Sequence, residues 1–227
     1  YCALPSTRYE IADQLTRFFF SFAMNDPIRI LGLAGGLRKA SYNRAALRAA
    51  QQLVPAGARL DIIELDGIPP FNQDHEASPP STVVQLKARI KDSDAVLFVT
   101  PEYNYSVPGV LKNAIDWAGR PYGQSAWQHK PAAIMGASIG SIGTARAQYH
   151  LRQMMVYLDM PVVNQPEVMI ASAAKRFNEQ GELTDETARK LIVQLLEALI
   201  DLTRKMAPPA RATTPSAEPA SSSNTRT

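Results

Sequence analysis

Short apolar segments alternate with longer amphipathic segments along most of this chain. The short segments are mainly apolar and are bounded by glycine, proline or polar residues, which is typical of buried strands. We expect strands at residues 28–33, 59–65, 95–100, 132–138 and 162–170. Apolar positions with helical spacing follow each of them, and we expect helices at residues 43–53, 82–91, 109–118, 144–158 and 184–206.

This alternation predicts one α/β domain at residues 27–206, because parallel strands joined by helices are covered on both faces. With right-handed crossovers, the simplest arrangement is a flavodoxin-like, doubly wound sheet of five strands in the order 2-1-3-4-5. Residues 1–26 show no clear period and are expected to be a poorly ordered extension, with the domain itself beginning near Met24. Residues 207–227, rich in proline, serine and threonine, are expected to be a disordered tail.

The loop after the third expected strand has the most informative composition. It reads Pro101, Glu102, Tyr103, Asn104 and Tyr105. Open α/β sheets hold their ligands at the carboxyl ends of their strands. The amide and the loop backbone can hydrogen-bond the edge of a flat heteroaromatic ring, while the tyrosines pack on it, so the loop predicts a flavin site. The alternative is an ordinary loop whose tyrosines only cover the core.

The loop after the first expected strand has the composition of a phosphate site. It carries Gly36, Arg38, Ser41, Tyr42 and Asn43 at the start of a helix. Small residues let backbone amides approach an anion, and the helix N-terminus adds a favourable dipole. The loop matches neither a P-loop nor a dinucleotide fingerprint, so it predicts a compact monophosphate site. A helix cap by Ser41 or Asn43 would use the same amides, and the two interpretations are compatible.

A third glycine-rich turn follows the fourth expected strand and contains Ser138 and Gly140. Three strand-end loops should therefore meet at one edge of the sheet. In the helix that follows, Arg146 and Tyr149 lie three residues apart on one face, which is too polar for a buried core. We expect that face to be an interface or an exposed surface.

Taken in order, the three loops resemble those of the NAD(P)H-dependent FMN reductase family, a flavodoxin-like group that includes bacterial quinone, chromate and azo-dye reductases. The loop at residues 101–105 resembles the loop that contacts the flavin ring, and Ser138 and Gly140 resemble the loop beside it. Residues 35–43 resemble the phosphate pattern Gly-Ser-x-Arg-x-x-Ser-x-Asn, with Gly36 where serine is usual. The resemblance covers roughly residues 27–205.

The resemblance implies FMN as cofactor and NADPH or NADH as electron donor. It implies a ping-pong, two-electron reduction of quinone-like, azo or metal-oxyanion acceptors, or of free flavin. Because the flavin performs the chemistry, no side chain is predicted to be catalytic. The family also implies a homodimer or homotetramer, with Arg146 and Tyr149 at an interface or substrate site near the flavin and Glu167, in the fifth expected strand, as an acidic partner.

Composition narrows the remaining possibilities. The single cysteine, Cys2, excludes intramolecular disulfides and cysteine-ligated iron–sulfur clusters. The histidines, His75, His129 and His150, lack metal-ligand spacing, so no metal site is predicted. The net charge of +3 comes without a dense basic run, and no apolar run has the length of a membrane span, so neither nucleic acid nor membrane is an expected partner. We expect a cytoplasmic protein.

Two other functions fit the same fold. One is a flavodoxin-type electron carrier without substrate turnover of its own, although such carriers are usually acidic and lack the Pro-Glu-Tyr-Asn loop. The other is a binder of a non-flavin nucleotide or sugar phosphate, since fold does not determine function.

Overall fold

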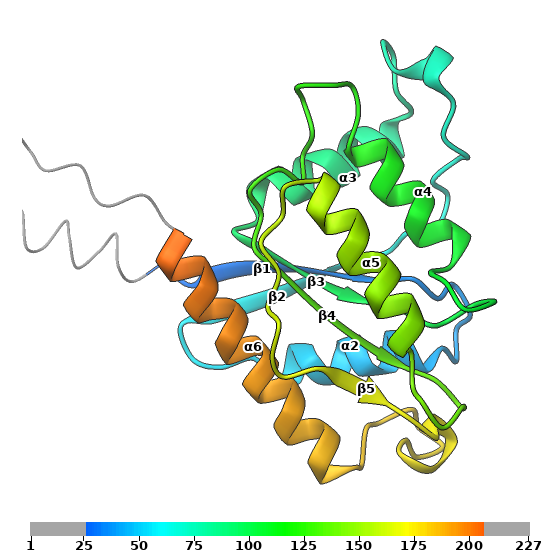
Figure 1. The fold of residues 1–227 in the computed structure, drawn as a ribbon, viewed down its shortest axis with the longest axis vertical. Coiled ribbons are helices and arrows are strands. Elements are labelled where there is room, and N and C mark those ends of the chain that lie inside the picture. The colour runs from blue at the N-terminus through cyan, green and yellow to red at the C-terminus, as the bar shows by residue number, and fades with distance from the viewer. Residues whose placement is uncertain (1–25, 207–227) are drawn as a thin grey trace, which may run out of the picture.

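The computed structural model describes residues 26–206 of the chain. The predicted tail, Met24 and nearly all of the predicted extension lie outside this range. Within it, five parallel strands form one sheet in the order β2-β1-β3-β4-β5, which confirms the predicted flavodoxin-like topology (Figure 1). The strands are β1 (Ile28–Ala34), β2 (Ala58–Ile63), β3 (Ala95–Val99), β4 (Ala132–Ala137) and β5 (Val168–Ile170).

Helices cover both faces of the sheet, as Figure 1 shows. They are α2 (Tyr42–Gln52), α3 (Ser81–Asp92), α4 (Gly109–Ala118), α5 (Ala145–Tyr157) and α6 (Glu186–Met206). Strand side chains alternate between the faces, so Ile30 packs in the core under α2 and α6, while Leu31 packs in the core under α3, α4 and α5. No helix among residues 26–206 is both long and apolar enough to cross a membrane.

The fifth strand is shorter than the sequence predicts. Strand β5 covers only Val168–Ile170, and Val162 makes a single isolated parallel bridge with Ala132. Pro166 interrupts the segment because proline has no N–H to donate to a ladder. Glu167 therefore precedes the strand instead of lying within it, and it is half-buried.

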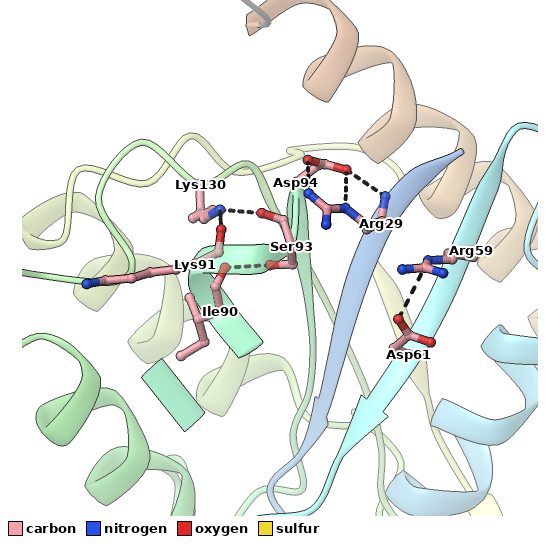
Figure 2. A network of polar contacts seen from close by, with 8 residues as sticks. All are labelled: Arg29, Arg59, Asp61, Ile90, Lys91, Ser93, Asp94 and Lys130. Carbon is pink, nitrogen blue, oxygen red and sulfur yellow. Dashed lines mark hydrogen bonds and ion pairs between the residues drawn. The ribbon is translucent and has the colours of Figure 1, made fainter. Parts of the chain in front are cut away.

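Charged side chains at the amino ends of the strands link neighbouring elements (Figure 2). The backbone N–H of Arg29, in β1, donates to Asp94 Oδ2 at 2.8 Å, and its Nε lies 3.4 Å from the same oxygen. Lys130 Nζ donates to the carbonyls of Lys91 and Ser93 at the end of α3. Burial lowers the pKa of Lys130 because it desolvates the ammonium group. These contacts join β1, β3 and the segment before β4 at the amino ends of the strands. The three loops predicted to bind a ligand lie at the opposite, carboxyl ends.

Candidate functional site

The loop after β1 approaches its neighbours so closely that side chains would not fit. Gly35 N–H donates to Val99 O at 2.9 Å, and a Cβ atom on Gly35 would lie 2.7 Å from Pro108 Cγ. A Cβ atom on Gly36 would lie 2.5 Å from Ser41 Oγ. Glycine at these two positions, both of which are buried, therefore lets the loop backbone pass close to Pro108 and Ser41 at the entrance to α2.

The first turn of α2 has backbone N–H groups of the kind that bind anions. Ser41 is the N-cap, and its Oγ lies 3.5 Å from Arg44 N. The N–H groups of Tyr42 and Asn43 belong to the first helical turn, where no intrahelical carbonyl faces them. Together with the helix dipole they form a site suited to a phosphate.

Two arginines flank this loop. Arg38 is exposed, and its Nη2 donates to Ala40 O at 3.0 Å, so the guanidinium remains near the loop with other donors available. Arg44 Nη1 donates to Leu37 O at 3.0 Å while Nη2 pairs with Glu64 at 2.8 Å. Arg44 thus supports the loop backbone. The sequence analysis missed this role, although the position of Arg44 in the first helical turn places it beside the loop.

Two of the predicted binding side chains are used by the fold. Asn43 is buried: its Nδ2 donates to Ala137 O at 2.9 Å, and its Oδ1 accepts from Ala137 N at 2.8 Å. The ring of Tyr42 packs on Phe177 with 5.3 Å between centroids. What these two residues offer an anion is therefore their backbone N–H groups, and their place in the cofactor site stays a prediction.

The loop at residues 101–108, here called the tyrosine loop, contains a tight turn. Tyr103 N–H donates to Ser106 O, and Ser106 N–H donates to Tyr103 O, both at 2.9 Å. Between them, Asn104 and Tyr105 have φ angles of 49° and 67°. Two successive positive φ angles define a type I′ turn, in which asparagine is favoured and a tyrosine is strained. The predicted ring-contacting residues Tyr103, Asn104 and Tyr105 are all exposed, whereas Pro101 is buried.

Glu102 is directed toward α5. Its side chain is 6% exposed, and its Oε2 accepts hydrogen bonds from Arg146 N at 3.0 Å and Ala147 N at 3.2 Å. Its Oε1 also forms an ion pair with Arg146 Nη2. Thr144, the residue at the N-cap of α5, makes no side-chain cap. Glu102 therefore caps α5 from a neighbouring loop, a location that the helix dipole favours, so what Glu102 offers a ligand is its backbone.

Two side chains of α5 also contact Tyr105 and Ser106 of the tyrosine loop. The Arg146 guanidinium stacks on the Tyr105 ring, 3.6 Å from its centroid. His150 Nδ1 lies 3.0 Å from Ser106 Oγ. Tyr149, in contrast, is 55% exposed and is free to meet a ligand or a partner. The face with Arg146 and Tyr149, expected to be an interface or an exposed surface, thus divides into one side chain that holds the loop and one that points outward.

The third loop lies between β4 and α5. Ser138 N–H donates to Ile170 O at 3.0 Å, and Ser138 Oγ accepts from Gly140 N at 3.1 Å. Gly140 O in turn accepts from Ser172 N at 3.0 Å. These bonds fix the loop against the end of β5 and leave Ile139 74% exposed at its tip. Ser138 and Gly140 lie where the sequence predicts, at the carboxyl edge of the sheet.

Side-chain hydrogen bonds connect the three loops at one end of the sheet, and their donor set fits a flavin mononucleotide. Asn43 connects the first loop to the third, and Glu102 connects the second to the helix after the third. The helix N-terminus and Arg38 suit a monophosphate, and the exposed tyrosines and amide suit a flat polar ring. Among residues 26–206, no group of three or more potential ligands could hold a metal ion.

A model of the NADPH-dependent FMN reductase family matches residues 28–175. The chain belongs to this family. It is 54% identical over 177 residues to an NAD(P)H-dependent FMN reductase of Pseudomonas aeruginosa, with 78% of this chain and 95% of the relative covered. A quinone reductase of Pseudomonas putida is 46% identical over 179 residues, with 78% and 94% covered.

Among solved structures, the chain is similar to FerB, a flavoenzyme NAD(P)H:(acceptor) oxidoreductase from Paracoccus denitrificans. The TM-score is 0.73 at 38% identity, with 79% of this chain and 98% of FerB covered. Family membership confirms the predicted resemblance, the enzyme class of NAD(P)H-dependent reductase, and FMN with NAD(P)H as the cofactors.

Proposed function

We propose that this protein uses NAD(P)H to reduce quinone-like acceptors, with FMN bound across the three loops at the carboxyl edge of the sheet. The observation that carries the proposal is the pair of cross-links that joins the loops into one site, Asn43 to Ala137 and Glu102 to Arg146. Relatives named quinone reductase support the choice of acceptor. When bound, FMN supplies the redox chemistry by accepting two electrons from NAD(P)H and donating them to the acceptor.

Each part of the chain has a distinct task in this proposal. The N–H groups at the start of α2 and the guanidinium of Arg38 bind the phosphate. Asn104 and the backbone of the tyrosine loop hydrogen-bond the ring edge, and Tyr103 supplies aromatic contact. Ser138 and Gly140 border the ring on the other side. No side chain has to act as nucleophile or general base.

The exposed side chains around the proposed site support flat, apolar acceptors. Tyr103, Tyr105 and Ile139 are 52%, 66% and 74% exposed, so an acceptor meets apolar and aromatic surface. Flat, uncharged molecules such as quinones and azo compounds suit this surface best. Metal oxyanions and free flavin are further proposed acceptors. NAD(P)H and the acceptor would occupy the same open site in turn, which gives ping-pong kinetics.

We include a homodimer or homotetramer in the proposal. A groove of about 540 Å³ between α4 and α5 is lined by Phe71, Tyr122 and Tyr157, among others. Beside it, Val156 and Tyr157 on α5 are 82% and 77% exposed. The groove and the exposed apolar side chains form one patch, and such a patch can pair with its own copy about a two-fold axis.

The remaining predictions about partners and location belong to the same proposal. Tyr149 and the half-buried Glu167 would meet a subunit or a substrate near the flavin. Light scattering tests assembly: Tyr157→Asp should shift the protein toward the monomer, and a wild-type protein that is monomeric at micromolar concentration would contradict it. A cytoplasmic location, where NAD(P)H is supplied, is tested by cell fractionation.

Steady-state kinetics test the proposed activity. Purified protein reconstituted with FMN should oxidise NADPH in the presence of a quinone, and double-reciprocal plots at several quinone concentrations should be parallel. The same assay with an azo dye, chromate and free FMN ranks the acceptors. Stoichiometric FMN binding without NADPH oxidation would favour the electron carrier instead. Failure to bind any flavin would favour the binder of another nucleotide.

A further inference from the structure

The second turn of α5 contacts the base of the turn in the tyrosine loop through His150. Its Nδ1 lies 3.0 Å from Ser106 Oγ, and Ser106 is the residue that closes the turn by pairing with Tyr103. A serine hydroxyl can donate to a ring nitrogen or accept from its N–H, so either tautomer of the imidazole maintains the contact.

The turn needs such support because its own bonds are few. Two backbone hydrogen bonds, both between Tyr103 and Ser106, close it. Its two central residues, Asn104 and Tyr105, have positive φ angles, and this conformation costs free energy for a tyrosine. A strained turn keeps its geometry only where neighbouring groups hold it.

Two side chains on one face of α5 contact the turn and support it. Arg146 and His150 are four residues apart, so they lie one above the other. Arg146 stacks on Tyr105 within the turn, and His150 contacts Ser106 at its base. Arg146 also pairs with the buried carboxylate of Glu102. The turn is therefore attached at Tyr105 and Ser106, and through the preceding Glu102, to a helix that itself packs on the sheet.

We propose that His150 is a positioning residue, which holds the tyrosine loop in the conformation that receives the flavin ring. The role of the loop rests on the proposed function, but the contact between His150 and the turn does not. His150 would act through Ser106, without touching the flavin or the acceptor. The spacing of histidines along the sequence gives no sign of this role, because it depends on a contact across 44 positions.

The first experiment measures the loop without any flavin. Hydrogen exchange of the flavin-free protein should be faster at the Tyr103 and Ser106 amides in His150→Ala, by roughly threefold, since one exposed hydrogen bond is lost. His150→Asn should restore slow exchange, because the asparagine δ atoms branch from the same carbon as Nδ1. His129→Ala is the matched control: His129 is an exposed histidine that lies 3.1 Å from Asp159 at the opposite edge of the sheet, and its loss should not alter exchange at these amides.

The second experiment measures FMN affinity by fluorescence titration of the same variants. His150→Ala should weaken FMN about threefold, and Ser106→Ala should do the same, while the double variant should be no weaker than either single one. Additive losses, or unchanged exchange in His150→Ala, would overturn the positioning role. So would faster exchange with unaltered FMN affinity. A wild-type protein that binds no FMN would instead refute the proposed function, and the exchange data would then still decide whether His150 holds the turn.

Discussion

Asn43 and Ala137 form two hydrogen bonds, in which the buried carboxamide donates to the carbonyl at 2.9 Å and accepts from the N–H at 2.8 Å. The two residues are 94 positions apart in the sequence. Because Asn43 lies in the first turn of α2 and Ala137 ends β4, this pair fixes the proposed phosphate loop relative to the loop after β4. One side chain thus aligns two parts of the site.

We predict that Asn43→Ala lowers both stability and FMN affinity. The change leaves the N–H and carbonyl of Ala137 buried without a partner, at a cost of about 2–4 kcal/mol. At about 2–4 °C per kcal/mol for a domain of this size, the melting temperature should fall by roughly 4–16 °C. Gln52→Ala removes an exposed amide from the same helix and serves as the control. Equal melting temperatures for the two variants would show that the pair contributes little.

Arg38→Ala should weaken FMN by about tenfold and riboflavin far less, because only FMN carries the phosphate and a charge-assisted hydrogen bond is lost. Titration of flavin fluorescence against each variant measures both affinities. Arg48→Ala, an exposed arginine further along α2, controls for the change in net charge. Equal losses of affinity for FMN and riboflavin would mean that the phosphate is bound elsewhere and not by Arg38.

The order of the strands could be predicted from the sequence because it depends on a repeated local pattern. Apolar strands alternating with amphipathic helices leave few arrangements once crossovers are right-handed. The extent of β5 could not be predicted in the same way. Apolar residues at both ends of the segment 162–170 suggest one strand, but pairing depends on where N–H groups meet a neighbour, and Pro166 has none to donate.

The positions of the three loops at the carboxyl ends of their strands could be predicted, whereas the direction of their side chains could not. Composition identified all three loops, since glycine, aromatic and amide residues at strand ends have few structural explanations. Yet Glu102 faces the N-terminus of α5, and its two backbone partners are 44 and 45 positions away. Contacts between residues so far apart depend on the packing of whole elements, which local spacing does not encode.

Stability should depend on pH through Asp185, which precedes α6. Its Oδ1 accepts a hydrogen bond from Ala188 N at 2.8 Å, and Arg176 pairs with it. The hydrogen bond from Ala188, followed by the contact with Arg176, holds the pKa of Asp185 below its ordinary value of 3.8. A depressed pKa means that the carboxylate stabilises the fold above the unfolded-state pKa, and that this contribution is lost as the pH falls through the folded-state pKa.

Asp185→Asn should therefore destabilise the protein at pH 7, and the difference from wild type should shrink as the pH falls below about 4. Urea unfolding at pH 7, 5 and 3 measures the difference. Asp66→Asn, on the exposed loop after β2, is the matched control. A difference between Asp185→Asn and wild type that stayed constant across this range would contradict the assignment.

Asn104 has a role in the turn and a proposed role at the flavin ring, and a pair of substitutions distinguishes them. Its φ of 49° suits asparagine or glycine in the type I′ turn, whereas alanine is strained there by about 1 kcal/mol. Asn104→Gly removes the carboxamide but keeps the turn. If that carboxamide binds the flavin ring, Asn104→Gly should weaken FMN about fivefold and shift its absorbance bands, with the melting temperature nearly unchanged.

Asn104→Ala should show the same spectral shift together with a lower melting temperature. Turnover should fall in both variants, and more steeply than binding, if the amide stabilises the reduced ring. Wild-type absorbance and turnover in Asn104→Gly would mean that the residue serves the turn alone and that the ring is held by other groups.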